Sequence, residues 1–81
     1  MNYKLSKHAI DVMSSRNVKE KWVDSTLETP SLVKKISIVE VHYFSKIEEN
    51  KNRCLKVVIN PTTRIIVTAY FDRNMRKKGC K

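Results

Sequence analysis

The sequence predicts an α+β fold in which two N-terminal helices pack on an antiparallel sheet of three or four strands. Apolar residues recur at helical spacing in the first 30 residues and in β-rich, alternating runs between residues 32 and 71. Helices that precede an antiparallel sheet are typical of α+β proteins. A chain of 81 residues has room for one domain, which we expect to span residues 1–73. Residues 74–81 are predicted to form a basic, mobile tail.

Two short helices are expected in the first third of the chain. Ser6 is a suitable N-cap for the first helix, and Asn17 suits the left-handed position at its end. The second helix is predicted from about residue 19 to residue 28, because Pro30 stops it. Its inward face should hold Trp22, Val23, Thr26 and Leu27. Lys19 is a poor N-cap, so the start of this helix should fray.

Three β-rich segments follow the helices. The first covers residues 35–44, where the doublet of Ile38 and Val39 breaks the alternation and indicates a bulge or burial on both faces. Residues 53–59 and 64–71 should form a hairpin around a turn at residues 60–63. In the last strand we expect Ile66, Thr68 and Tyr70 to share one face.

The chain is strongly basic, and its charge is concentrated at the C-terminal end. Seventeen Lys and Arg residues oppose eight Asp and Glu residues, which gives a net charge of +9. From residue 51 onward, nine basic residues face Asp72 alone. This distribution favours a polyanionic partner, either nucleic acid or an acidic protein, over a merely solubilising surface.

Cysteine usage and hydropathy predict a cytoplasmic protein. The longest apolar runs are too short to cross a membrane, and the first eight residues lack the apolar stretch of a signal peptide. Cys54 lies in a predicted strand and Cys80 in the basic tail, with no Cys-x-x-Cys motif and no paired histidine near them. We therefore expect neither a zinc site nor a disulfide framework.

Several short motifs resemble a family of small bacterial proteins that is related to BrnT and to the RelE/ParE-like toxins. They are Leu5-Ser6-Lys7-His8-Ala9, Arg16-Asn17-Val18, Leu27-Glu28-Thr29-Pro30, Leu55-Lys56-Val57-Val58-Ile59-Asn60-Pro61 and Arg64-Ile65-Ile66-Val67-Thr68-Ala69-Tyr70-Phe71. The resemblance covers about residues 3–73. It implies a compact helix–helix–sheet fold whose relatives are mostly endoribonucleases, with some gyrase inhibitors. It also implies an antitoxin as the partner, with which the chain would form a hetero-oligomer.

RNA cleavage without a metal or another cofactor suits these residues. RNA supplies its own nucleophile, the 2′-OH, so an enzyme needs only proton-exchanging groups and cations to stabilise the phosphorane. A two-metal nuclease needs several converging carboxylates, whereas Glu40 is the one acidic residue in the middle of a predicted strand. We therefore predict no metal and no cofactor.

Four residues are candidates for catalysis. His8 lies in the first turn of a helix, where the helix dipole favours a neutral imidazole and attracts phosphate. Tyr70 can exchange a proton or stack on a base. Arg53 and Arg73 should meet at one end of the final hairpin and form a phosphate clamp, with Arg64 at the other end. Structural roles remain alternatives for His8 and Tyr70.

A second set of residues is expected to bind nucleic acid through the phosphate backbone. Its members are polar or basic: Ser6, Lys7, Arg16, Lys56, Arg76, Lys77 and Lys78. For His42, which is in phase with Glu40 and Phe44 and able to pair with Glu40, a structural role is favoured over a catalytic one.

The favoured function is that of a type II toxin, an endoribonuclease that acts on RNA, either free or on the ribosome, and is counteracted by an acidic antitoxin. The alternative is a noncatalytic nucleic-acid-binding protein or a gyrase-inhibiting toxin. A family member that has lost its catalytic residues is a third reading.

Overall fold

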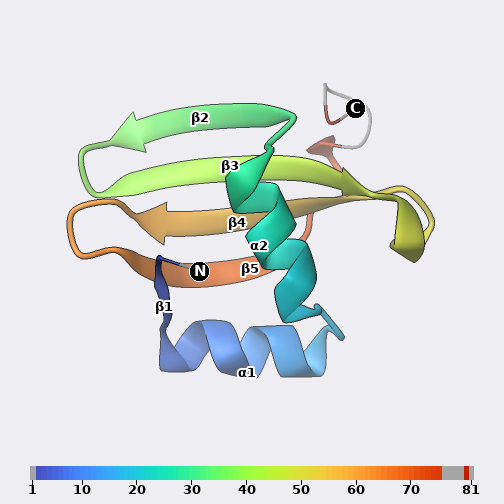
Figure 1. Ribbon diagram of the computed structural model, residues 1–81, viewed down its shortest axis with the longest axis horizontal. Helices are drawn as coiled ribbons and strands as arrows, with labels where there is room; N and C mark the ends of the chain where they lie inside the picture. The colour runs from blue at the N-terminus through green and yellow to red at the C-terminus, as the bar shows by residue number, and fades with distance from the viewer. Residues whose placement is uncertain (1, 76–79, 81) are drawn as a thin grey trace.

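Two helices and five strands make up the described part of this computed structural model, which covers residues 2–75 and residue 80. The elements in chain order are β1 (Lys4–Leu5), α1 (Lys7–Ser15), α2 (Glu20–Glu28), β2 (Leu32–Ser37), β3 (Glu40–Ile47), a 3₁₀ turn (Glu48–Asn50), β4 (Arg53–Asn60) and β5 (Ile65–Phe71). The strands form one sheet in the order β1–β5–β4–β3–β2 (Figure 1). β1 runs parallel to β5, and the other neighbours are antiparallel.

The α+β class and the two helices are confirmed, but the sheet is mixed and has five strands in place of three or four antiparallel ones. The segment predicted as one strand over residues 35–44 is the β2–β3 hairpin. Ile38 and Val39 form its turn and are 77% and 49% exposed, so neither a bulge nor two-sided burial occurs at this doublet. β1 has two residues, which are too few to show an alternation in the sequence.

The first helix is positioned by its cap. The Ser6 side chain accepts a hydrogen bond from the Ala9 N–H (3.0 Å), as predicted, and its hydroxyl donates to the Val67 carbonyl of β5 (3.0 Å). Asn17 ends the helical segment with a φ of 55°, which confirms the left-handed position. One serine therefore caps α1 and also joins it to the sheet.

The second helix packs across the sheet with the predicted face inward. Trp22, Val23 and Thr26 are buried, and the Thr26 hydroxyl donates to the Trp22 carbonyl (2.8 Å). Lys19 makes no side-chain capping bond, as expected. On the outer side, the ammonium group of Lys21 lies 3.0 Å from the Glu49 carboxylate in the 3₁₀ turn, and this hydrogen bond lowers the pKa of Glu49.

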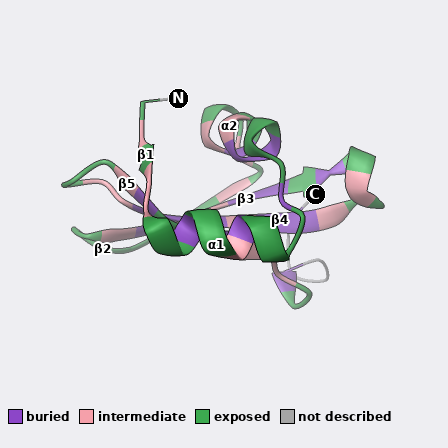
Figure 2. Cartoon of the chain, turned by 90° about the horizontal axis from the view of Figure 1, so that it is seen from below, coloured by how far each residue is buried: buried purple, intermediate pink, exposed green. Residues whose placement is uncertain are grey.

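α2 lies over one face of the sheet and α1 runs along β5 at the edge, and the buried residues of both helices join those of the strands in one main core (Figure 2). The buried residues of this core are Ala9, Met13, Val18, Trp22, Val23, Val41, Ile47, Leu55, Val57, Ile59, Ile66 and Ala69. Neither helix is long or apolar enough to span a membrane; each has nine residues, and no other helix in the described ranges qualifies.

A bulge in β5 changes the faces that its side chains occupy. Ile59 pairs with Ile66 while the preceding residue, Val58, pairs with Thr68, so Val67 is an extra residue in the ladder. Ile66 therefore points into the main core, and the prediction that it shares a face with Thr68 and Tyr70 is wrong. Thr68 and Tyr70 remain together on the opposite face, since two residues separate them in regular strand geometry.

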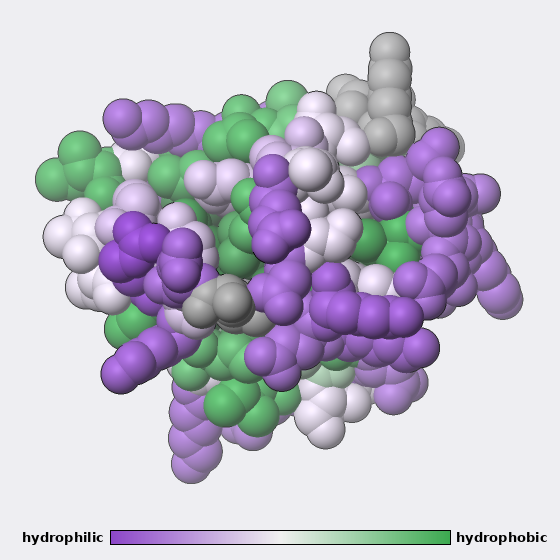
Figure 3. Space-filling view, viewed as in Figure 1, coloured by the Kyte–Doolittle hydropathy of each residue, from purple (hydrophilic) through white to green (hydrophobic). Residues whose placement is uncertain are grey.

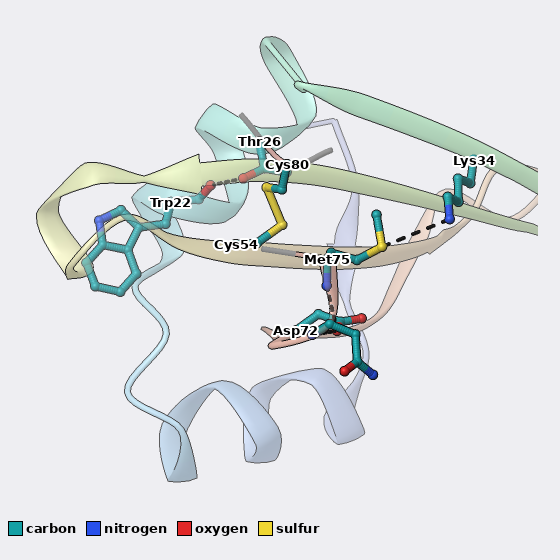
Figure 4. The surroundings of a disulfide bond; sticks show 8 residues. Trp22, Thr26, Lys34, Cys54, Asp72, Met75 and Cys80 are labelled. Atoms are coloured by element: carbon teal, nitrogen blue, oxygen red, sulfur yellow. Dashed lines mark hydrogen bonds between the residues drawn. A yellow bond between two sulfur atoms is a disulfide. The ribbon is translucent and has the colours of Figure 1, made fainter. Parts of the chain in front are cut away.

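A second apolar cluster lies on the side of the sheet that the helices do not cover. It consists of Phe44, Cys54, Met75 and Cys80, with Leu32 packed against them. Cys54 and Cys80 form a disulfide with their Cα atoms 5.9 Å apart, so the prediction that these cysteines are not bridged is wrong (Figure 4). Met75 and Cys80 are 6% and 7% exposed, which means that the segment predicted as a mobile tail is packed on the sheet at these two positions.

Removal of the Ser6 hydroxyl should destabilise the chain by about 1–2 kcal/mol, because Ser6→Ala loses both the helix cap and the bond to β5. Urea unfolding followed by circular dichroism measures this loss. Ser15→Ala is the matched control, since Ser15 is an exposed serine at the other end of α1. Equal stability of the two variants would contradict the prediction.

The lowered pKa of Glu49 gives a small stabilisation that is present at neutral pH and is lost as the pH falls through the folded-state pKa. Lys21→Ala should therefore raise the NMR titration midpoint of the Glu49 carboxyl group towards its ordinary value. Lys7→Ala, on the other helix, should leave this midpoint in place. An unchanged midpoint in Lys21→Ala would show that the ion pair does not form.

Candidate nucleic-acid interface

The side of the sheet that the helices do not cover carries a group of basic and aromatic side chains. Two rows of cross-strand partners build it: Lys34, His42, Val58 and Thr68 in one row, and Leu32, Phe44, Lys56 and Tyr70 in the next. Phe44 belongs to the apolar cluster that is separate from the main core, which places these rows opposite the helices. We call the surface formed by Lys34, His42, Phe44, Lys56 and Tyr70 the open face.

Each lysine of the open face lies over an aromatic ring. The ammonium group of Lys34 is 5.9 Å from the centre of the Phe44 ring, and that of Lys56 is 5.5 Å from the centre of the Tyr70 ring. These contacts hold the lysine stems along the sheet and leave two cations above it, one from β2 and one from β4. This arrangement suits a flexible single strand, since phosphates pair with the cations and a base can stack on Tyr70, whereas Phe44 is buried.

His42 is held by a carboxylate on the same strand. Its Nε2 lies 2.6 Å from Oε2 of Glu40, and its ring meets Phe44 edge to face at 6.4 Å between centroids. The His42 side chain is 14% exposed, whereas that of Glu40 is 47% exposed. A carboxylate in this position orients the imidazole through Nε2, which leaves Nδ1 for proton exchange.

Residues 5–71 match the family model described as a domain of unknown function, DUF4258. The chain belongs to this family. In the comparisons with curated proteins and with solved structures, nothing matches the chain. The DUF4258 region contains all five residues of the open face, whereas Met75 and Cys80 lie beyond it.

The predicted catalytic residues do not meet at one place in this DUF4258 chain. His8 is exposed in the first turn of α1, close to the start of β5, because the Ser6 N–H donates to the Ile66 carbonyl (3.1 Å). Arg53 and Arg73 lie at the other end of β5, as the pairing of Leu55 with Phe71 requires. Seven residues of extended strand separate the two ends.

Arg53 and Arg73 share one end of the hairpin, as predicted, but they differ in their surroundings. The Arg53 guanidinium lies 4.9 Å from the centre of the Phe71 ring, which in turn packs edge to face on Trp22. Arg53 is thus half-buried on the helix side of the sheet, while Arg73 is exposed in the turn after β5. Arg64 lies at the opposite end of the hairpin, 4.8 Å from the centre of the Tyr3 ring.

The predicted nucleic-acid-binding residues are also dispersed. Ser6 and Lys7 are at the start of α1, and Arg16 is exposed at its end. Lys56 reaches the open face beside Tyr70, so one residue from each predicted set is brought together. Arg76, Lys77 and Lys78 lie outside the described residues.

Three residues of the open face, Lys34, His42 and Phe44, were not predicted as site residues. Lys34 was missed because β2 was not recognised as a separate strand. For His42 the sequence did show the decisive feature, the i,i+2 spacing with Glu40, and the predicted contact between the two is confirmed. Among the described residues, no three His, Cys, Asp or Glu side chains are placed to hold a metal ion.

Replacement of Arg53 and of Arg73 should show that the Arg53 side chain stabilises the fold and that the exposed Arg73 side chain does not. Arg53→Ala should lower the free energy of unfolding by about 1 kcal/mol, because the guanidinium no longer covers Phe71. Arg73→Ala is the matched control and should stay within about 0.5 kcal/mol of the unaltered chain. Chemical denaturation measures both, and an Arg53→Ala variant as stable as Arg73→Ala would contradict the stacking role.

Proposed function

We propose that this chain is an endoribonuclease toxin, related to the RelE/ParE-like and BrnT-like toxins, that binds and cleaves RNA on the open face without a metal. The observation that carries the proposal is the position of His42, which is held by Glu40 and lies opposite Lys34 on the same side of the sheet as Lys56 and Tyr70. This arrangement combines a group that can exchange protons with cations that can hold a phosphate.

Lys56 occupies the centre of the proposed site. It is directly opposite Tyr70 on β5 and next to His42 on β3, one row away. The backbones of β3 and β5 are about 10 Å apart across β4, which leaves space for a phosphodiester above Lys56. His42 and Tyr70 then flank the phosphate from opposite sides.

The proposed reaction is an internal transesterification. His42 Nδ1 takes the proton of the 2′-OH, whose oxygen attacks the adjacent phosphorus, and Glu40 stabilises the imidazolium that forms. Lys34 and Lys56 offset the negative charge of the phosphorane. The 5′ oxygen leaves with a proton from the acid on the other side, for which Tyr70 is placed. The products are a 2′,3′-cyclic phosphate and a 5′-hydroxyl end.

Loss of His42 should abolish cleavage while the fold is retained. His42→Asn should reduce the yield of new 5′-hydroxyl ends in RNA by about 100-fold or more after brief induction in a bacterial host. Lys56→Ala should reduce it by at least about tenfold. Lys35→Ala is the matched control, because Lys35 is an exposed lysine next to Lys34 that alternates to the other side of β2.

The same experiment separates the alternatives. Purified chain should yield the same ends in the presence of EDTA when cleavage is free of the ribosome. Cleavage that persists in His42→Asn would exclude His42 as the base and would leave His8 as the histidine to test for that role. Growth inhibition without new RNA ends would contradict cleavage and favour a binding target, which a supercoiling assay with purified gyrase would test.

An acidic antitoxin remains the protein partner that we propose. β2 forms an outer edge of the sheet and pairs with β3 on its inner side. Exposed apolar residues follow this edge and the adjoining turn: Val33, Ile36, Ile38 and Val39. In Figure 3, hydrophobic atoms gather at the end of the molecule where the β2–β3 turn lies. Because Lys34 and Lys35 accompany them, an extended acidic segment with apolar side chains suits this edge.

A further inference from the structure

Phe44 is the central ring of the open face, yet it is covered. Its side chain is 2% exposed, and it packs with Cys54, Met75 and Cys80, with Leu32 alongside. Met75 and Cys80 come from the segment that follows β5. Two of the chain's own residues, Met75 and Cys80, therefore cover the aromatic residue that lies between the cations of the proposed RNA site.

The first part of this segment is turned onto the open face by hydrogen bonds. The Asp72 N–H donates to the Cys54 carbonyl (2.9 Å), and the Asp72 carboxylate accepts from the N–H groups of Asn74 (2.9 Å) and Met75 (3.4 Å). At its far end, Cys80 donates its N–H to the Met75 carbonyl (3.2 Å) and is bonded to Cys54 through the disulfide (Figure 4). The disulfide is thus the direct link between the end of this segment and the sheet.

The covered area overlaps the cationic part of the open face. The ammonium group of Lys34 lies 4.0 Å from the Met75 sulfur and 5.9 Å from the centre of the Phe44 ring. A base that stacks on Phe44 would need the space that Met75 and Cys80 fill. RNA would therefore compete with Met75 and Cys80 for the same ring.

We propose that the Cys54–Cys80 disulfide is a redox-operated latch: when it is intact Met75 and Cys80 cover Phe44, and when it is reduced these two residues leave the ring and Phe44 becomes available for RNA. This regulation rests on the function proposed above, because it acts on the same face. It makes RNA binding stronger under reducing conditions.

The reductant is a dithiol, and the exchange balances in two steps. One thiolate of the dithiol attacks Cys80 Sγ, the S–S bond to Cys54 breaks, and Cys54 leaves as a thiolate that takes up a proton. The second thiol of the reductant then displaces Cys80, which also ends as a thiol. Two electrons pass to the two cysteines, and the reductant becomes a disulfide.

Release of Met75 and Cys80 from the sheet is measured without RNA. Amide hydrogen exchange at Met75 and Cys80 should be at least about tenfold faster in the chain reduced with dithiothreitol than in the oxidised chain. Cys80→Ser should exchange at the faster rate whether or not dithiothreitol is present. Equal exchange in the oxidised and reduced chains would overturn the latch.

Binding is measured with a short single-stranded RNA whose 2′-OH groups are methylated, so that cleavage cannot occur. Fluorescence anisotropy at fixed ionic strength should show about tenfold tighter binding to the reduced chain than to the oxidised chain, since one base–aromatic stack is gained. Cys80→Ser should bind as tightly as the reduced chain and should not respond to dithiothreitol. Phe44→Leu should lose the gain, whereas Phe44→Tyr, which keeps a ring, should retain it.

The outcomes separate the latch from the function on which it rests. Equal RNA affinity in the two redox states, with faster exchange in the reduced one, would overturn the regulation and leave the proposed RNA site standing. RNA binding in neither state would overturn the proposed function and the regulation together. A gain that persists in Phe44→Leu would overturn Phe44 as the residue that the latch uncovers.

Discussion

The burial of one side of the sheet in the core that it shares with the helices is the constraint on which the rest of the structure depends. Leu55, Val57 and Ile59 alternate towards α1 and α2 and are at most 1% exposed. Because side chains alternate along a strand, the residues between them must face the other way. Cys54, Lys56 and Val58 are therefore placed on the open face by the same register that builds the core.

The sequence predicted those features in which local pattern and tertiary structure agree. Ser6 and Pro30 marked helix ends, and the alternation of the last strand placed Thr68 and Tyr70 on one face. The β2–β3 turn was not predicted, because Ile38 and Val39 are strand-forming residues with no Gly, Asn or Asp beside them to indicate a turn. The bulge at Val67 was likewise not visible, since an extra residue in a ladder is defined by the partner strand.

The candidate site was predicted in part, for a related reason. Sequence reasoning favoured residues next to recognisable signals, such as a helix start or a strand end, and so selected His8, Arg53 and Arg73. The open face is instead a product of pairing between β2, β3, β4 and β5, which joins residues as distant as Lys34 and Tyr70. Such long-range register is fixed by burial of the opposite side of the sheet.

The second apolar cluster shows how a small domain can combine stability with regulation. A disulfide that closes a separation of 26 residues stabilises a chain mainly by restricting its unfolded state, so its reduction weakens the fold as it opens the face. The main core includes neither cysteine, and its twelve buried residues come from α1, the segment after it, α2, β3, β4 and β5. The helices and sheet can therefore persist when the disulfide is broken. What changes first is the cover on Phe44, because Met75 and Cys80 have their buried contacts in the second cluster.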